Sequence, residues 1–338
     1  MLQLLLDFPD QCRYAAKIAA DARILFDRHK FRNIVFTGLG GSAIGADLVL
    51  SYLYFESELP ITVAREYDLP GYVDEATLVF VSSYSGNTEE TLSAYSHARE
   101  KNATIVVISS GGKLKDLALR DAVTFIELPQ GVPPRCAVGY SSIVLLGALA
   151  RLGLVKNIEA SVSETIRTLE DLRNLCLKPQ IGQKDNIAKY IAGSLFNKFA
   201  FIYSSSVHFD AVAMRFRGQL SENSKALALT HVFPEMNHNE IVGWEHPQKL
   251  FKDFVVIMLR DKYMHERVGV RMDITRDLIK EVGVNVLEIW SRGEGLLARM
   301  FSLIYIGDFA SFYLAILYGV DPTPVHRLDY LKHRLGQI

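Results

Sequence analysis

The sequence predicts an α/β fold of two doubly wound α/β sandwich subdomains with mainly parallel sheets. Three observations support this prediction. The length of 338 residues exceeds what one hydrophobic core usually organises. Short β-rich apolar runs alternate with helical patterns through the first 150 residues, as in parallel sheets. The same alternation then resumes after the polar stretch 178–185.

The first half of the chain is predicted to contain five strands separated by helices. An amphipathic helix between Gln11 and His29 comes first, with its apolar face formed by Ala15, Ile18, Ala19, Ala22 and Leu25. The predicted strands are 33–37, 61–65, 77–82, 103–108 and 123–127. The predicted helices are 43–54, 88–100, 112–119 and 138–151.

The second half repeats this pattern less clearly. A charged helical segment, 158–177, leads through the linker 178–185 to strands at 199–203, 254–259 and 284–290. The first of these strands runs into Ser204–Ser206 and a helix at 211–220, which resembles the start of the first half. We therefore predict a first domain at 1–152, a helical connection at 153–185 and a second domain at 186–338.

Composition argues against several classes of partner. Net charge is −1, from 37 basic and 38 acidic residues, so no bulk field attracts nucleic acid or anionic lipid. The run Phe309–Val320 is shorter than the roughly 20 residues of a membrane span, so we expect a buried helix. Three cysteines without metal spacing and no signal peptide favour a cytoplasmic protein with no metal site.

Two hydroxyl-rich glycine loops are the most informative feature of the chain. Gly38-Leu-Gly-Gly-Ser-Ala-Ile-Gly45 and Ser82-Ser-Tyr-Ser-Gly-Asn-Thr-Glu-Glu-Thr91 each follow a predicted strand and lead into a predicted helix. Parallel strands deliver such loops to one sheet edge, where backbone N–H groups at helix starts bind anions. We therefore predict a phosphate site at Gly41, Ser42, Ser83, Ser85 and Thr88.

Two other interpretations of these loops remain open at this point. The first loop also fits a relaxed dinucleotide-binding pattern, and Glu66 lies where that pattern places its ribose-binding acid. A nicotinamide-dependent oxidoreductase is therefore one alternative. The second loop could simply be a well-capped helix start, although three small hydroxyls exceed what capping requires.

Three charged side chains are candidates for chemistry beside this phosphate site. Glu222 follows a predicted helix in a short polar stretch and could act as a base. His238 lies between two asparagines that could orient its ring, so it could move protons near neutral pH. Arg135 follows two prolines and could stabilise a developing oxyanion.

Two further interpretations of charged residues are weaker. A metal site would draw its ligands from His231, Glu235, His238 and Glu240, but Pro234 interrupts their helical spacing. Lys332 lies on a short C-terminal helix, where a lysine is ordinarily a solvated surface residue.

Taken in order along the chain, these motifs resemble the bifunctional phosphoglucose/phosphomannose isomerases, a branch of the sugar isomerase (SIS) family with flavodoxin-like subdomains. The similarity covers nearly the whole chain. It is carried by both loops, by Arg135, and by the segments Ser221–Lys225, Asn237–Trp244 and Asp321–Pro324 with Lys332.

The resemblance implies a metal-independent aldose–ketose isomerase that acts on hexose 6-phosphates through a cis-enediolate and uses no cofactor. It assigns Glu222 as the base, His238 and Lys332 to ring opening, and Arg135 to the enediolate oxygen. It also implies a homodimer in which His238 acts in the neighbouring subunit's site. A small residue, with Thr323 nearby, would allow epimerisation at C2. A non-catalytic sugar-phosphate-binding SIS regulator remains the alternative.

Overall fold

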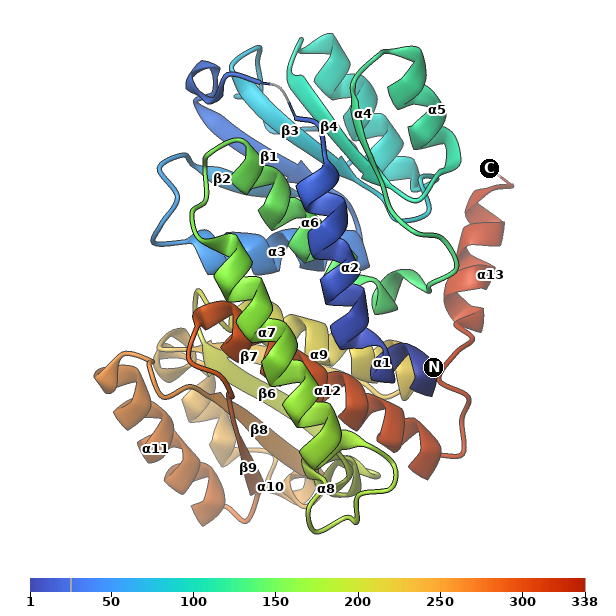
Figure 1. The fold of residues 1–338 in the computed structure, drawn as a ribbon. Helices are drawn as coiled ribbons and strands as arrows, with labels where there is room; N and C mark the ends of the chain where they lie inside the picture. The colour runs from blue at the N-terminus through green and yellow to red at the C-terminus, as the bar shows by residue number, and fades with distance from the viewer. Residues whose placement is uncertain (25, 338) are drawn as a thin grey trace. The chain divides into compact units, whose positions relative to one another are not determined.

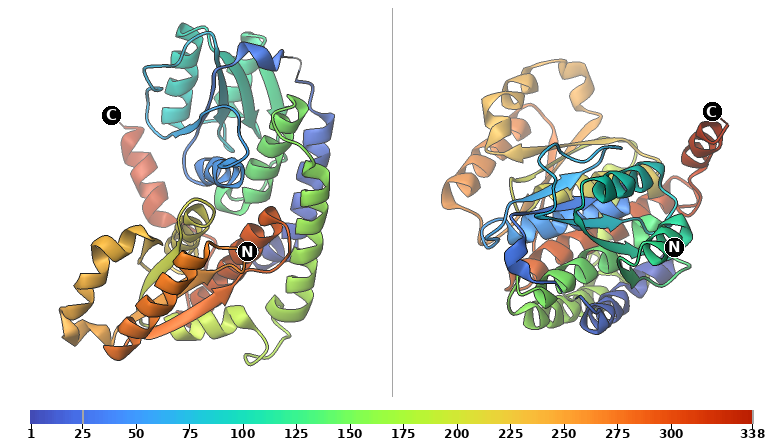
Figure 2. Two further views of the ribbon diagram at one scale, coloured as in Figure 1. Left: turned by 90° about the vertical axis from the view of Figure 1, so that its left-hand side faces the viewer. Right: turned by 90° about the horizontal axis from the view of Figure 1, so that it is seen from above.

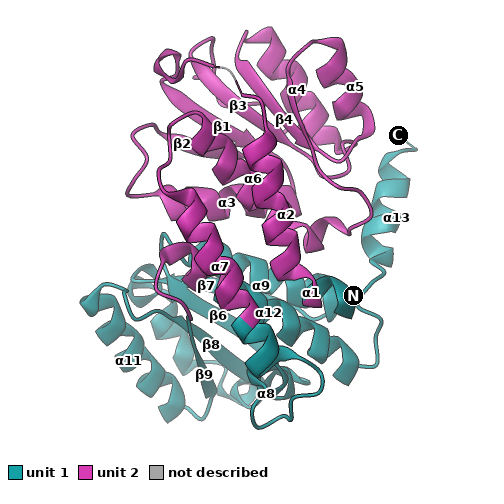
Figure 3. Ribbon diagram, in the orientation of Figure 1, with its two compact units in different colours: residues 1–5, 171–291, 302–338 teal, residues 6–170, 292–301 magenta. Residues whose placement is uncertain are grey.

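The computed structural model describes residues 1–24 and 26–337, so Leu25 of the predicted first helix and Ile338 lie outside the described residues. The chain folds into two compact units (Figure 3). Unit 2 comprises residues 6–170 and 292–301, and unit 1 comprises residues 1–5, 171–291 and 302–338. Both units are discontinuous in sequence, whereas our predicted domains are continuous segments.

Unit 2 contains a five-stranded parallel sheet with the strand order β2-β1-β3-β4-β5 (Figure 1). Its strands are β1 (Asn33–Thr37), β2 (Ile61–Ala64), β3 (Thr77–Ser82), β4 (Thr104–Ser109) and β5 (Thr124–Glu127). In the register of the central pair, Phe36 lies beside Phe80. Strand β3 is buried along its whole length because helices cover both faces of the sheet.

The helices of unit 2 follow the strands in the predicted rhythm (Figures 1 and 2). Helices α4 (Glu89–Glu100) and α5 (Gly112–Arg120) pack with Val79 and Val81 on one face. The other helices of the unit are α2 (Phe8–Asp21), α3 (Gly41–Leu53), α6 (Val138–Arg151) and α7 (Ile158–Leu172), with the 3₁₀ turns η1 (Arg28–Lys30) and η2 (Pro134–Cys136).

Unit 1 contains a four-stranded parallel sheet with the order β7-β6-β8-β9. Its strands are β6 (Phe199–Ser205), β7 (Ala228–Phe233), β8 (Phe254–Arg260) and β9 (Asn285–Trp290). Counted from its own first strand, this order repeats the order of the first four strands of unit 2. Both sheets are doubly wound and parallel, which confirms the predicted fold class.

The helices of unit 1 also cover both faces of its sheet (Figure 2). Helix α11 packs on one face over Tyr203 and Met258, and on α12 the glycine Gly307 lies against the ring of Phe216 in α9. The helical segments are η3 (Arg173–Leu177), α8 (Ile187–Leu195), α9 (Asp210–Asn223), η4 (Glu235–His238), η5 (Glu240–Glu245), α10 (Gln248–Phe251), α11 (Glu266–Glu281), α12 (Leu296–Leu317) and α13 (His326–Leu335). The part of α12 before Ser302 belongs to unit 2.

Residues 1–5 belong to unit 1, most of which comes from the second half of the chain. Helix α1 (Leu2–Leu6) begins the chain, and the carbonyl of Leu5 accepts a 2.7 Å hydrogen bond from the hydroxyl of Tyr305 in α12. This bond is buried and joins positions 300 residues apart. Residues from both ends of the chain therefore complete one unit.

Two sequence predictions are wrong in extent. The first helix begins at Phe8 with a proline in its first turn and ends at Asp21, because Ala22 adopts an extended backbone. Helix α12 has 22 residues and a mean hydropathy of 1.7, so it is long enough to span a membrane, contrary to our length argument. However, 83% of its most apolar window is buried within the protein, as in a core helix.

Candidate active site

The first glycine loop leads from β1 to an uncapped helix start. Gly40 precedes α3 with a φ of 54°, in the left-handed region that glycine tolerates best. No side chain caps α3, and its first turn carries no acidic residue. The first N–H groups of a helix have no intrahelical partner, so this end of α3 is suited to an anion.

The second loop is held by its own hydroxyl groups. Ser83 Oγ lies 2.9 Å from Thr88 Oγ1 and accepts a 3.1 Å hydrogen bond from the N–H of Gly86. Thr88 occupies the N-cap position of α4, but its side chain does not cap the helix. The first turn of α4 also contains Glu89 and Glu90, so α3 offers the more favourable electrostatic environment for a phosphate.

A hydrogen bond joins the two loops at the switch point of the sheet. The N–H of Tyr84 donates to Ser42 Oγ at 3.3 Å. Strands β1 and β3 are neighbours, and the strand order reverses between them, which is where doubly wound sheets bind ligands. Ser42, Ser83, Ser85 and Thr88 thus lie in two loops that the structure brings together. Ser42 and Ser83 are buried, whereas Ser85 is exposed.

Close packing of the backbone around Gly41 and Pro134 places Arg135 at the same edge of the sheet as the two glycine loops. A Cβ added to Gly41 would lie 2.4 Å from the carbonyl oxygen of Pro134, so glycine is required where the two segments cross. Gly41 therefore has a packing role that the sequence did not reveal. Arg135 itself is buried in η2.

Two residues that the sequence analysis overlooked hold the segment around Arg135. The first is Tyr84, whose hydroxyl donates to the carbonyl of Pro129 at 2.6 Å and accepts from the N–H of Val132 at 3.1 Å. Burial raises the pKa of Tyr84 further above its ordinary value. Tyr84 thereby connects the second loop to the chain that leads to Arg135.

The second is Gln11 of α2, which holds the other side of Arg135. Its amide donates to the carbonyl of Cys136 at 2.8 Å and accepts from the N–H of Gly139 at 2.9 Å. The sequence contained a signal for this role. Gln11 shares the four-residue spacing of Ala15 and Ala19, so it had to lie on the buried face of the helix.

Within unit 1, the predicted base and the predicted histidine lie at opposite ends of the sheet. Glu222 is in the last turn of α9, near the residues that begin β7, whereas His238 follows the carboxyl end of β7 in η4. Six residues of strand separate these edges, which corresponds to about 20 Å. Within unit 1, the predicted base and histidine therefore lie at opposite edges of the sheet.

The loop around His238 is fixed by its neighbours. Asn237 Nδ2 donates to Thr275 Oγ1 at 2.9 Å, and Asn239 Oδ1 accepts from the N–H of Glu240. Both asparagines therefore brace the loop, and the expected contacts to the imidazole ring are not among their bonds. Tyr203 donates its hydroxyl to Glu240, and burial followed by this carboxylate raises the pKa of Tyr203.

The remaining candidates lie in the C-terminal segment of unit 1. Helix α13, which carries Lys332, has no buried residue and stands apart from the other elements of its unit (Figure 3). Thr323 precedes it, and its N–H donates to Asp321 Oδ1 at 2.8 Å. Hydrogen bonds from Thr323, first the N–H and then the hydroxyl, lower the pKa of Asp321.

The alternative metal set is not assembled. In residues 1–24 and 26–337, no group of three or more His, Cys, Asp or Glu side chains is placed to hold a metal ion. Of the four candidates, His231 Nε2 and Glu240 Oε2 form a pair at 3.9 Å.

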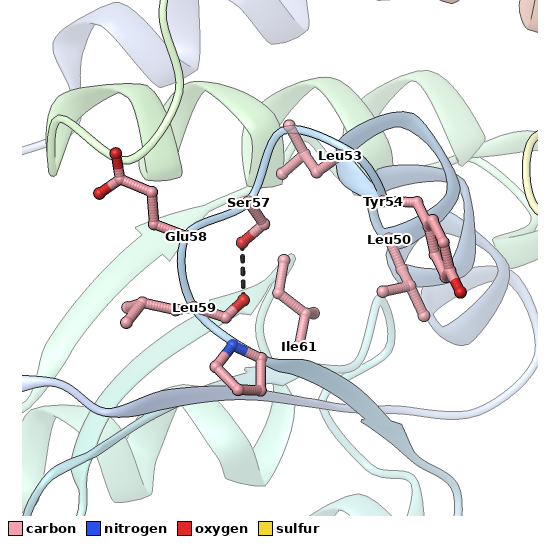
Figure 4. A pocket seen from close by; sticks show the side chains of 8 residues that line it. Leu50, Leu53, Tyr54, Ser57, Glu58, Leu59 and Ile61 are labelled. Carbon is pink, nitrogen blue, oxygen red and sulfur yellow. Dashed lines mark hydrogen bonds between the residues drawn. The ribbon is translucent and has the colours of Figure 1, made fainter.

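A pocket of about 330 Å³ lies elsewhere on unit 2, between the end of α3 and the start of β2 (Figure 4). Its lining includes Leu53, Tyr54 and Ile61, and the hydroxyl of Ser57 donates to the carbonyl of Leu59 at 2.7 Å. This is the amino edge of the sheet, opposite the two glycine loops. The pocket has no cluster of charged groups and is not the candidate active site.

The family matches assign the chain to a class of protein, the SIS-domain proteins. Residues 28–127 match the SIS domain family, and residues 184–335 match the family described as bacterial phospho-glucose isomerase C-terminal SIS domain. A hypothetical protein from Thermus thermophilus has the same fold, with a TM-score of 0.79, 14% identity, and coverage of 98% of this chain and 89% of that one.

Two relatives identify the family within the SIS-domain proteins to which this chain belongs. The bifunctional phosphoglucose/phosphomannose isomerase of Caldicellulosiruptor bescii is 46% identical over 100% of this chain and 99% of its own length. The enzyme of the same name from Aquifex aeolicus is 35% identical over 91% and 92% of the two chains. This chain belongs to the bifunctional phosphoglucose/phosphomannose isomerase family.

Proposed function

We propose that this protein is an aldose–ketose isomerase that interconverts glucose 6-phosphate and mannose 6-phosphate with fructose 6-phosphate. The full-length match to enzymes that bear both activities in their name carries this proposal. The site supports it physically. A pair of hydroxyl-rich loops at the switch point suits a phosphate, as the substrates require.

The reaction needs a base and a charge stabiliser. In the open aldose, the Glu222 carboxylate takes the proton from C2, and the C–H electron pair forms the C1=C2 bond of a cis-enediolate while O1 becomes negative. The guanidinium of Arg135 stabilises this charge. Glu222 then returns the proton to C1, and the O2 proton moves to O1, which leaves a ketone at C2.

Ring opening belongs to His238 and Lys332 in this proposal. His238 would act in the site of the neighbouring subunit, so the active form would be a homodimer. The separation of Glu222 and His238 by about one strand length within unit 1 supports this arrangement. Thr323 would leave room for rotation about C2–C3, so both aldoses are accepted. A cytoplasmic location and roles in glycolysis and gluconeogenesis complete the proposal.

Labelling in deuterium oxide tests both activities. Mannose 6-phosphate incubated with the protein and EDTA should yield fructose 6-phosphate and then glucose 6-phosphate with deuterium at C2. Glu222→Gln should lower turnover by at least about 10³-fold, because the amide cannot accept the carbon-bound proton. Glu281→Gln is the matched control, since Glu281 is an exposed glutamate at the end of another helix of the same unit, α11.

Each outcome bears on a separate part of the proposal. Failure of the unaltered protein to convert any of the three sugars would contradict the proposed activity. Turnover that requires added metal would contradict the metal-independent mechanism. Normal turnover by Glu222→Gln would remove Glu222 from the role of base while leaving the activity itself intact.

A further inference from the structure

Helix α9 is followed by a lysine in an unusual backbone conformation. Lys225 has a φ of 58°, in the left-handed region, where helix ends usually carry glycine or asparagine. Three of the six non-glycine residues with positive φ in the described chain are asparagines. Because lysine is unfavourable in this backbone conformation, we looked for contacts of its side chain that favour it there.

That side chain joins two distant segments of unit 1. Lys225 Nζ donates to the carbonyl of Glu222 at 2.6 Å and to the carbonyl of Pro324 at 2.8 Å. Lys225 and Pro324 are 99 positions apart in sequence. The two carbonyl oxygens can therefore lie no further apart than these two bonds together allow.

The segment reached by Lys225 is itself ordered. The bond from the Thr323 N–H to Asp321 closes the turn, and the charge of Lys225 adds to the effect of Thr323 in lowering the pKa of Asp321. One ammonium group thus faces the Glu222 main chain on one side and the turn 321–324 on the other.

We propose that Lys225 is a positioning residue that fixes the main chain of Glu222 against the turn Asp321–Pro324, so that the base and this turn form one rigid edge of the active site. The inference rests on the proposed function because it takes Glu222 as the base. It adds a residue to which the sequence analysis gave no role.

The exposure of Lys225 distinguishes a role in positioning Glu222 from a role in stabilising the fold. Lys225 is exposed, so water can replace its two bonds at little cost to the fold. The position of Glu222 is more sensitive, since a misplacement of about 1 Å can cost about 10²-fold in rate. Loss of the lysine should therefore affect turnover more than stability.

The test compares two lysines that make the same kind of contact. Lys225→Gly removes both bonds and also suits the left-handed backbone, and Lys225→Met keeps an unbranched side chain of nearly the same length without the ammonium group. The control is Lys189→Met, because Lys189 Nζ donates to the carbonyls of Pro179 and Ile181 at 2.7 and 2.8 Å in the same unit. Steady-state kinetics with all three sugars, thermal unfolding and amide hydrogen exchange are measured for each variant.

We expect both Lys225 variants to lose about 10- to 100-fold in kcat while KM for fructose 6-phosphate stays within about twofold, since the phosphate loops are untouched. The mannose-to-glucose preference in kcat/KM should shift, and the amide of Thr323 should exchange faster. Lys189→Met should lower Tm without any of these changes.

The inference is overturned if Lys225→Gly keeps kcat within about twofold of the unaltered protein with the same aldose preference, because a positioning residue must change both. It is also overturned if Thr323 exchange stays as slow as before. Absence of turnover in the unaltered protein would instead count against the proposed function. The exchange measurement would still test whether Lys225 holds the Glu222 main chain against the turn Asp321–Pro324.

Discussion

Ser83 and Ser85 have the same side chain and lie two positions apart, and each hydroxyl accepts a hydrogen bond from a loop N–H, yet they differ in burial. Ser83 is buried and its hydroxyl bonds to Thr88 and to the N–H of Gly86. Ser85 is exposed at the surface of the same loop. The sequence predicted both as phosphate ligands because spacing alone does not show which of two hydroxyls is buried and which is exposed.

Alanine substitutions should separate the roles of the buried and the exposed hydroxyl. Ser83→Ala removes the hydroxyl bonds to Thr88 and to the N–H of Gly86, which keeps its 3.0 Å bond to the Ser83 carbonyl, and should destabilise the protein by about 0.5–1.5 kcal/mol. Ser85→Ala should leave Tm unchanged and raise KM for fructose 6-phosphate by about tenfold. Urea unfolding and steady-state kinetics measure the two effects, and equal losses of stability would contradict this division.

Asp121 gives a pH-dependent contribution to stability. The Arg120 guanidinium and then the Tyr95 hydroxyl hold its pKa at about 2, below its ordinary value of 3.8. A lowered pKa in the folded state means that the stabilisation is complete above pH 3.8 and is lost as the pH falls through about 2. Asp121→Asn should therefore be less stable than the unaltered protein at pH 6.

The same comparison at lower pH checks the sign. In urea unfolding at pH 6, 4 and 3, the stability difference between Asp121→Asn and the unaltered protein should shrink as the pH falls. A difference that stays constant, or grows toward acid, would show that Asp121 stabilises the protein through packing rather than through its charge.

At the scale of elements, the sequence predicted the strands of unit 2 and most of its helices, since both have strong periodicity. It missed β7, the edge strand of the second sheet. Thr230 and His231 interrupt its apolar pattern, and one face of an edge strand need not be buried. The partner Pro324 of Lys225 and the partners of Gln11 lie far away in sequence, so the chain gave no local sign of these contacts, although spacing did indicate the burial of Gln11.

A buried ion pair joins two helices of unit 1. Arg215 of α9 donates to Asp308 of α12 at 2.6 Å, and both side chains are at least 95% buried. Burial raises the pKa of Asp308, and Arg215 acts in the opposite direction. Asp308→Asn should destabilise the protein by about 3–5 kcal/mol, because it leaves the Arg215 charge buried without its counterion.

A double variant provides the control for this pair. Replacing both partners, as Arg215→Met with Asp308→Leu, removes both charges and should cost less than Asp308→Asn alone. Denaturant unfolding of the three proteins measures the difference. If the double variant is the least stable, the pair contributes favourable energy beyond neutralising its own burial.

At the scale of the whole molecule, the two sheets share a strand order but not the same loops. Gly38–Gly45 has no counterpart after β6, where Val207 adopts a φ of 73° that a glycine would hold with less strain. The sequence showed this difference directly. It could not show that the chain returns to each unit, since contacts between distant segments leave no local pattern.

Subunit mixing tests the proposed sharing of sites. If His238 acts in the neighbouring subunit, mixing Glu222→Gln with His238→Ala after subunit exchange should restore about a quarter of the wild-type activity, because half of the dimers then hold one complete site. Mixing each variant with itself is the control. Activity that stays at the level of the separate variants would show that each site uses its own histidine.

The bond between Leu5 and Tyr305 also has a consequence for how the protein is made. A ribosome releases residues 1–5 long before it translates α12, so these residues must wait for a partner that emerges 300 positions later. Vectorial synthesis therefore cannot finish unit 1 until α12 has left the ribosome. A fusion tag placed ahead of Met1 would be attached to a segment that matures late.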